Sequence, residues 1–283
     1  MKTTLTIGWA QTDITPDKST PLSGQFHTRL STGVLDPLTA TALAIASADA
    51  SESVLLVSID AVWAADATRD QLRARLAKTL PDFDPRRLVI GGTHTHTAPS
   101  QVSRYLDYPV GDRPDLLSQE AYTAFLVDKL EALCRQAWTT RQPGGFAFGR
   151  APAVIGHNRR AVYENGDAVM YGATDRDDFS HVEGAEHHYL DALFTYDPAG
   201  ALTGMVLNVA CPSQVSERLY QVSADFWHDT RREIRARLGA NLFLLPQCGA
   251  AGDQSPHIQT EKAAARRMLE RIAAADLQLF QCL

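Results

Sequence analysis

Apolar positions follow two kinds of spacing along the chain, and together they predict a mixture of strands and helices. Short apolar or alternating runs predict strands over residues 5–9, 39–47, 54–60, 87–90, 190–196, 201–209 and 241–245. Helical spacing or capping residues predict helices over residues 66–80, 119–138 and 226–238, and a last helix is expected over residues 261–275. Because strands and helices intermingle along the chain, the pattern predicts an α/β fold of mixed β-sheets with flanking helices.

The order of the elements predicts which strands pair. Residues 39–47 and 54–60 are expected to form a hairpin, and so are residues 190–196 and 201–209, which flank an Asp-Pro-Ala-Gly turn. From residue 54 to residue 96 the order is strand, helix, strand, which predicts a right-handed βαβ unit. Asp66 is the expected N-cap of its helix. From residue 146 onward the pattern predicts short strands and turns.

Composition and charge narrow the class of protein. The 283 residues are 45% hydrophobic and are expected to form one catalytic-type domain over residues 1–283. The net charge of −6 argues against nucleic acid as a partner. We find no secretory h-region and no apolar run of about 20 residues, so no integral membrane segment and a cytoplasmic location are expected. The sequence does not indicate an oligomeric state. The four cysteines lack paired spacing and are interpreted as reduced thiols: Cys134, Cys211, Cys248 and Cys282.

Two histidines directly follow the strand predicted over residues 87–90. Gly91 and Gly92 allow the backbone to turn, and His94 and His96 come next at positions i and i+2. In an extended segment these side chains would point to the same side, where two imidazoles can share a metal ion. A hydrogen-bonded pair of structural histidines is the alternative, and the spacing alone leaves both open.

Other polar side chains follow predicted strands or lie in loops. Asp60 ends a buried strand and is expected to cap a helix or loop. Cys211 and Cys248 each follow a strand, although a buried inert thiol is the commoner situation. Ser255 follows small residues that allow close approach, but it lacks the G-x-S-x-G context of a strained nucleophile. Solvated surface is the expectation for the remaining loop candidates, His27, Arg29, His181, His187 and His188.

Four stretches in order resemble motifs of the amino-terminal catalytic region of the neutral/alkaline, non-lysosomal ceramidase family. Residues 91–99 are similar to its T-H-T-H-S-G-P segment, residues 156–160 to its N-R motif, and residues 252–257 to its G-D-V-S-P-N segment. Residues 209–214 fall where the family has a strand ending in a His-Pro-Thr type turn. The resemblance covers nearly the whole chain, and it implies a zinc-dependent amidase related to enzymes that split the N-acyl bond of ceramide.

The resemblance also implies roles for single residues. It makes His94 a zinc ligand, His96 a second active-site histidine near metal or substrate, and Arg159 a group that binds substrate or oxyanion. Ser255 stands at the serine of the amidase motif, and Asp253 beside it is expected to position ligands.

The sequence departs from the family at three points. Cys211 stands where the family has its second zinc histidine, and a thiolate is a sound zinc ligand. His257 replaces the last Asn of the fourth motif and would add a proton donor. The family takes a Glu and a Tyr ligand from a later region. A short, divergent member is therefore expected, in which these ligands are missing, are replaced by others, or belong to a longer protein of which this chain is a C-terminally truncated form.

The sequence therefore predicts a Zn²⁺-dependent hydrolase of an N-acyl amide bond in a small-molecule or lipid-like substrate, not necessarily ceramide. Zinc would be held by His94, Cys211 and His96. One alternative is a metal-free cysteine hydrolase that uses Cys211 or Cys248. Another is a non-catalytic or incomplete member of the family.

Overall fold

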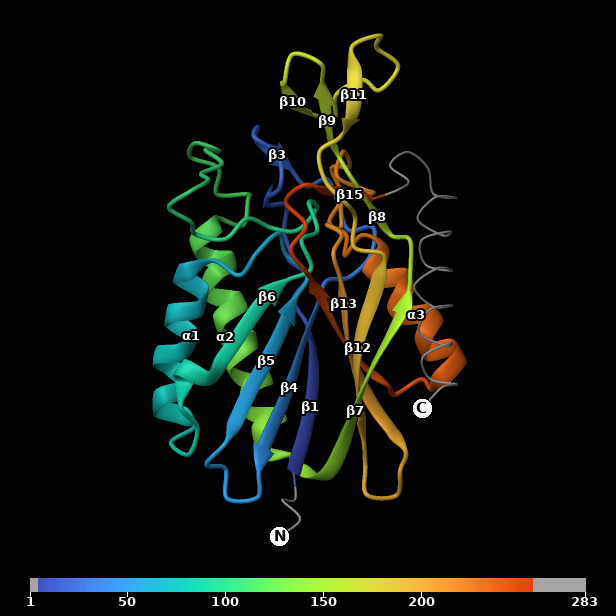
Figure 1. Cartoon of the computed structure of the whole chain (residues 1–283). Helices are drawn as coiled ribbons and strands as arrows, with labels where there is room; N and C mark the ends of the chain where they lie inside the picture. Colours follow the sequence, from blue (N-terminus) through green and yellow to red (C-terminus); the bar gives the residue numbers. More distant parts are fainter. Residues whose placement is uncertain (1–4, 257–283) are drawn as a thin grey trace.

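A computed structural model describes residues 5–256 of the chain (Figure 1). One large mixed sheet runs through the molecule, beside smaller sheets. Its strand order is β14-β13-β12-β7-β1-β4-β5-β6, and only the pairs β5–β6 and β13–β14 are parallel. The strands are β1 Leu5–Asp13, β2 Pro21–Leu22, β3 Arg29–Leu30, β4 Thr39–Ser47, β5 Ser53–Ile59, β6 Leu88–Gly92, β7 Gln142–Pro152, β8 Gly156–Asn158, β9 Arg160–Tyr163, β10 Ala168–Met170, β11 Phe179–Val182, β12 Tyr189–Tyr196, β13 Leu202–Val209, β14 Phe243–Cys248 and β15 Gln254–Pro256.

Among the described residues, three α-helices cover the sheet. Helices α1 (Asp66–Thr79) and α2 (Gln119–Thr139) pack on the half formed by β1, β4, β5 and β6, whereas α3 (Phe226–Leu238) packs on the half formed by β7, β12, β13 and β14 (Figure 1). A short 3-10 helix, η1 (Pro85–Arg87), precedes β6. Each helix thus buries its apolar face against one half of the sheet.

The two halves of the sheet also pack against each other. The indole of Trp9 on β1 stacks on the ring of Phe243 on β14, with ring centroids 5.7 Å apart, and its Nε1 donates to Thr195 Oγ1 on β12 at 2.9 Å. Leu43 and Leu245 complete this inner layer. Because successive side chains of a strand face opposite sides, each half presents one face to its helices and one to the other half. The result is four layers, helices–sheet–sheet–helix.

The mixed α/β fold predicted from the sequence is confirmed. Strand β4 has the predicted bounds, its hairpin with β5 is antiparallel, and α1 connects β5 to a parallel β6. The hairpin of β12 and β13 is also confirmed, as is Asp225 as the N-cap of α3. Cys134, a residue of α2, is fully buried, as predicted.

Two local predictions were wrong. The N-cap of α1 is Ala65, and Asp66 is instead the first helical residue, ion-paired with Arg69 and Arg104. Strand β7 begins at Gln142 and is 11 residues long, because its first residues pair with β1 before the strand continues along β12.

A buried ion pair ties α3 to the sheet. Asp60, at the end of β5, accepts hydrogen bonds from both Nη atoms of Arg231 at 2.8 and 2.9 Å and from the backbone N–H of Thr39 at 2.8 Å. The predicted capping role of Asp60 is therefore confirmed, and the ion pair is an addition that the sequence did not indicate.

Two predictions lie outside the described residues, namely the helix over residues 261–275 and the role of His257. Within residues 5–256, none of the helices combines the length and the apolar character that crossing a membrane requires.

Candidate active site

The candidate site is built from loops that follow β6, β8, β13 and β14. Ser213 Oγ donates to the carbonyl of Thr93 at 2.7 Å, which joins the loop after β13 to the histidine loop (residues 93–97). Strand β15 pairs with β8, and Arg159 Nη2 donates to the carbonyl of Gly252 at 2.8 Å. The four stretches that carry the family resemblance thus meet at one end of the sheet.

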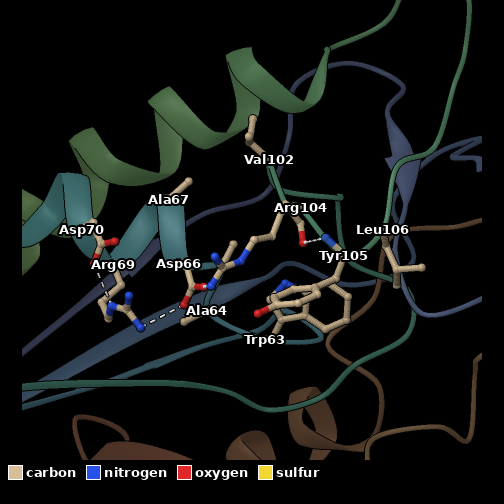
Figure 2. A pocket seen from close by; sticks show the side chains of 12 residues that line it. Trp63, Ala64, Asp66, Ala67, Arg69, Asp70, Val102, Arg104, Tyr105 and Leu106 are labelled. Carbon is tan, nitrogen blue, oxygen red and sulfur yellow. Dashed lines mark hydrogen bonds and ion pairs between the residues drawn. The ribbon is translucent and has the colours of Figure 1, made fainter.

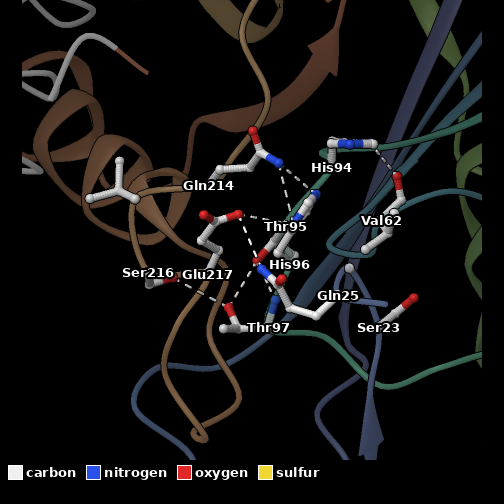
Figure 3. A network of polar contacts seen from close by, with 12 residues as sticks. Ser23, Gln25, Val62, His94, Thr95, His96, Thr97, Gln214, Ser216 and Glu217 are labelled. Atoms are coloured by element: carbon white, nitrogen blue, oxygen red, sulfur yellow. Dashed lines mark hydrogen bonds and ion pairs between the residues drawn. The ribbon is translucent and has the colours of Figure 1, made fainter. Parts of the chain in front are cut away.

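His94 is held as a neutral imidazole with a defined tautomer. Its Nδ1 lies 2.9 Å from the carbonyl oxygen of Val62, so Nδ1 carries the proton and Nε2 keeps its lone pair (Figure 3). Burial, together with the charge of His96, lowers the pKa of His94 to about 4. The backbone of His94 is left-handed, with φ of 65°, a conformation that is uncommon for a residue with a side chain. Such strain is typical of functional loops.

His96 lies beside His94 and is largely buried. The two ring centroids are 5.0 Å apart at an interplanar angle of 57°, and His96 is 8% exposed. Its Nδ1 is 3.4 Å from Glu217 Oε2, and its Nε2 is 3.0 Å from Gln214 Nε2. Gly24, with φ of 103°, leaves room for this ring, because a Cβ there would lie 2.5 Å from His96 Cγ. The ring therefore has one defined place in the site.

The predicted proximity of the two histidines is correct, but the predicted reason is wrong. We expected an extended segment in which side chains at i and i+2 share a side. The segment after β6 is not a strand, and the left-handed backbone of His94 breaks the alternation. The rings meet because the histidine loop turns sharply, not because it is extended.

Arg159 brings a positive charge to the same site. Its Nη1 donates to the hydroxyl of Tyr171 at 2.7 Å, and its charge contributes to the lowered pKa of His94. The Nε of Arg159 is buried and has no partner among the described residues. A guanidinium with an unused N–H beside two imidazoles can bind an oxyanion.

Asp253 and Ser255 occupy the neighbouring segment. The carboxylate of Asp253 accepts from Asn158 Nδ2 at 2.9 Å, and its carbonyl accepts from the backbone N–H of Arg159 at 2.8 Å. Asp253 therefore holds the junction between β8 and β9, where Arg159 lies. Ser255 is fully buried and pairs with His157 across β15 and β8. A nucleophilic role for Ser255 stays a prediction.

Both cysteines named as alternatives are held as thiols. Cys211 is fully buried, and burial raises its pKa well above the ordinary value. Burial also raises the pKa of Cys248 to about 11. Cys248 Sγ lies 3.5 Å from the carbonyl of Cys211, and Cys211 Sγ lies 3.5 Å from that of Pro212. Because the thiolate is the nucleophile, these surroundings disfavour the cysteine-hydrolase alternative.

We expect alkylation by iodoacetamide to be slow at Cys248. At pH 7.5 a pKa of about 11 lowers the thiolate fraction roughly 300-fold relative to a free cysteine, offset about 10-fold by higher intrinsic nucleophilicity. With chelator present, Cys248 of the native protein should therefore react at least roughly 30-fold more slowly than Cys248 of the urea-unfolded protein. Peptide mass mapping separates the four cysteines, and rapid native labelling of Cys211 or Cys248 would revive the thiol alternative.

The described residues do not assemble the donor set of a catalytic zinc. Such a site needs three protein ligands and an open position. His94 meets the requirement for one ligand, since its Nε2 keeps a lone pair and its ring is neutral. Throughout residues 5–256, however, no three His, Cys, Asp or Glu side chains gather closely enough to hold a metal ion. Zinc binding by His94, Cys211 and His96 stays a prediction.

Arg29 was predicted to be solvated, and this is wrong. It is 2% exposed, and its Nη atoms donate to four backbone carbonyls. The acceptors are the carbonyl oxygens of Ser23, His96, Glu217 and Leu219. One guanidinium therefore ties three loops of the site together. The other loop candidates, His27, His181, His187 and His188, are exposed as expected.

Sequence reasoning also missed Gln214 and Glu217, and it predicted Asp225 only as a helix cap. Asp225 has a left-handed backbone, and its carboxylate accepts from Ser216 N at 2.6 Å and from Val215 N at 3.3 Å. This fixes the segment that carries Glu217. The available signal was the density of polar residues between Cys211 and Phe226, a long connection without apolar periodicity.

A cavity of about 690 Å³ is lined by residues of the segments 63–70 and 102–106 (Figure 2). Trp63, Val102, Tyr105 and Leu106 give it a largely apolar lining, and Asp66 pairs with Arg104 at its rim. Trp63 follows Val62, whose carbonyl binds His94, so the cavity adjoins the site through the backbone. An apolar portion of a substrate fits this lining.

The fold is similar to that of neutral ceramidase. The crystal structure of neutral ceramidase from Pseudomonas aeruginosa superposes with a TM-score of 0.81 and 18% sequence identity, over 99% of this chain and 45% of that chain. A structure described as a ceramidase complexed with C2 gives a TM-score of 0.79 and 19% identity, over 99% of this chain and 44% of that one. The chain thus spans less than half the length of these two proteins. No protein-family model and no curated protein sequence matches it. The resemblance drawn from the four stretches is confirmed at the level of the fold: this chain shares the fold of neutral ceramidase.

Proposed function

We propose that this chain hydrolyses an N-acyl amide bond at the site formed by His94, His96 and Arg159. The observation that carries the proposal is the meeting of these three side chains from two loops, with the imidazole rings 5.0 Å apart and the charge of Arg159 acting on His94. The name of the structural neighbour, ceramidase, motivates the amide class, and the largely apolar cavity supports a lipid-like acyl or alkyl group.

The chemistry follows from the groups present. Hydrolysis forms a bond between a water oxygen and the carbonyl carbon and breaks the bond from that carbon to nitrogen. His96 accepts a proton from the attacking water and returns it to the leaving amine. Arg159 donates hydrogen bonds to the oxyanion that develops in between. Both products, a carboxylate and an amine, then leave.

An assay of amine release tests the proposal. The panel contains N-acylsphingosines of short and long chain and N-acyl amino acids, each with wild type, His96→Ala and Arg159→Met. We expect kcat/KM to fall at least about 100-fold for His96→Ala and about 10- to 1000-fold for Arg159→Met. His181→Ala, at an exposed histidine, is the matched control and should retain activity. Hydrolysis that survives in His96→Ala contradicts the assignment, and a folded wild type without turnover favours the non-catalytic alternative.

Zinc dependence is a separate proposal with its own test. Elemental mass spectrometry of the purified protein, beside His94→Ala and Cys211→Ala, measures metal per chain. About one zinc per chain, lost in both variants, supports a shared site. Amide hydrolysis that persists after chelation rejects a role for the metal in the reaction.

A further inference from the structure

The ring of His96 is enclosed by three polar side chains from two other segments (Figure 3). Glu217 Oε2 lies 3.4 Å from Nδ1, and it also accepts from Gln25 Nε2 at 3.3 Å. Gln214 Nε2 lies 3.0 Å from Nε2 of the ring and 3.3 Å from Nδ1. Glu217 is therefore the acceptor beside Nδ1, whereas the Gln214 amide lies over the ring face, close to both ring nitrogens.

The main chains of His96 and Glu217 are held by the same side chain. Arg29 Nη2 donates to the carbonyl of His96, and Arg29 Nη1 donates to the carbonyl of Glu217. Asp225 accepts from the backbone N–H of Ser216, the residue before Glu217. The distance between the carboxylate and the imidazole is thus fixed by the surrounding loops and does not depend on the pair itself.

We propose that Glu217 is a positioning residue that holds His96 in the Nδ1–H tautomer, so that Nε2 presents its lone pair to the reacting water. A carboxylate can only accept, so the nitrogen that faces Glu217 must carry the proton. The amide nitrogen of Gln214 lies close to both ring nitrogens, at 3.0 and 3.3 Å, so it does not distinguish the two tautomers and leaves the choice to Glu217. The catalytic part of this assignment rests on the proposed amide hydrolysis.

The neighbouring histidine agrees with this assignment. His94 shows the same arrangement, with its Nδ1 facing the carbonyl of Val62. Both rings of the site are thus oriented through Nδ1, which leaves both Nε2 atoms for chemistry.

Nitrogen NMR of the histidine rings tests the tautomer without any substrate. Spectra at pH 8 with chelator, with the His96 signals assigned by their absence in His96→Gln, distinguish Nδ1–H from Nε2–H. We expect Nδ1–H in wild type. We expect it also in Glu217→Gln, whose amide oxygen still accepts, and a shift toward Nε2–H in Glu217→Leu. A wild-type ring with the proton on Nε2 overturns the proposal whether or not the variants fold, and so does a Glu217→Leu ring that keeps Nδ1–H.

Kinetics test the catalytic consequence. With an amide substrate, Glu217→Leu should lower kcat about 10- to 100-fold with little change in KM, and Glu217→Gln should recover most of that loss. Glu52→Leu is the matched control, because it changes an exposed glutamate that is distant from Glu217 in the sequence. An unchanged kcat in Glu217→Leu overturns the catalytic part. If wild type hydrolyses no amide, the proposed function fails, and the NMR result still decides the tautomer.

Discussion

Replacing Arg29 by methionine is expected to lower the free energy of unfolding by about 3–5 kcal/mol. Four charge-assisted hydrogen bonds at about 1.5–3 kcal/mol each would suggest roughly 6–12 kcal/mol. Burial of the guanidinium offsets part of this, as shown by its lowered pKa, for which desolvation is the main cause. The net loss is therefore smaller, but the variant leaves the carbonyls of Ser23, His96, Glu217 and Leu219 without their donor.

Urea unfolding at pH 7.5 measures this loss as a shift of the midpoint at constant slope. Arg29→Lys is the matched variant, because it keeps the charge but lacks the planar fork that serves carbonyls from two nitrogens. We expect it to recover less than half of the loss. Arg73→Met, at a partly buried arginine that donates to the carbonyl of Leu88, should cost less than about 1.5 kcal/mol. A loss below 1 kcal/mol for Arg29→Met would mean that the loops hold without this guanidinium.

Elements that rest on local patterns were predictable from the sequence. Strand β4 alternates small and apolar residues between clear turns, and α2 carries apolar side chains at helical spacing over 21 residues. The Asp-Pro-Ala-Gly turn fixed the hairpin of β12 and β13, because Asp197 accepts from two backbone N–H groups within it. In each case the stabilising contacts lie within or next to the element itself.

The clamp formed by Arg29 could not be predicted in this way. Arg29 and Glu217 are 188 positions apart in the sequence, and an arginine in a polar loop is normally predicted to be exposed to solvent. Its burial depends on how two distant loops fold over it. Glu217 and Gln214 were missed for the same reason, since only the fold brings their polar loop against the ring of His96.

The two histidines were correctly predicted to lie close together, although their local structure was predicted incorrectly. The sequence signal was a pair of histidines that follow a predicted strand. This signal places the two side chains near each other in any tight loop at the edge of the sheet, whether or not the loop is extended. The conformation of His94 depends on long-range contacts, namely its N–H to the carbonyl of Ala61 and its Nδ1 to that of Val62. Residue type therefore predicted the location of the site, whereas tertiary contacts determine its geometry.

Lowering the pH from 8 to 5 is expected to destabilise the protein by about 2 kcal/mol through His94 alone. Its pKa is about 4 in the folded protein against about 6.5 unfolded, mainly because burial disfavours the charged ring. A depressed pKa means that the unfolded chain binds the proton more readily. The stabilisation is therefore complete above about pH 6.5 and is lost as the pH falls toward 4.

The difference between wild type and His94→Gln isolates this contribution, because other groups titrate in both proteins. Urea unfolding of each at several pH values, with chelator present to exclude metal competition, should give curves that converge by about 2 kcal/mol between pH 8 and pH 5. His181→Gln, at an exposed histidine, should run parallel to wild type. Curves of wild type and His94→Gln that stay parallel would show that the His94 ring titrates normally. In that case His94 would be an ordinary solvated imidazole. The ring would be protonated at acidic pH, and its Nε2 would then offer no lone pair to a metal ion.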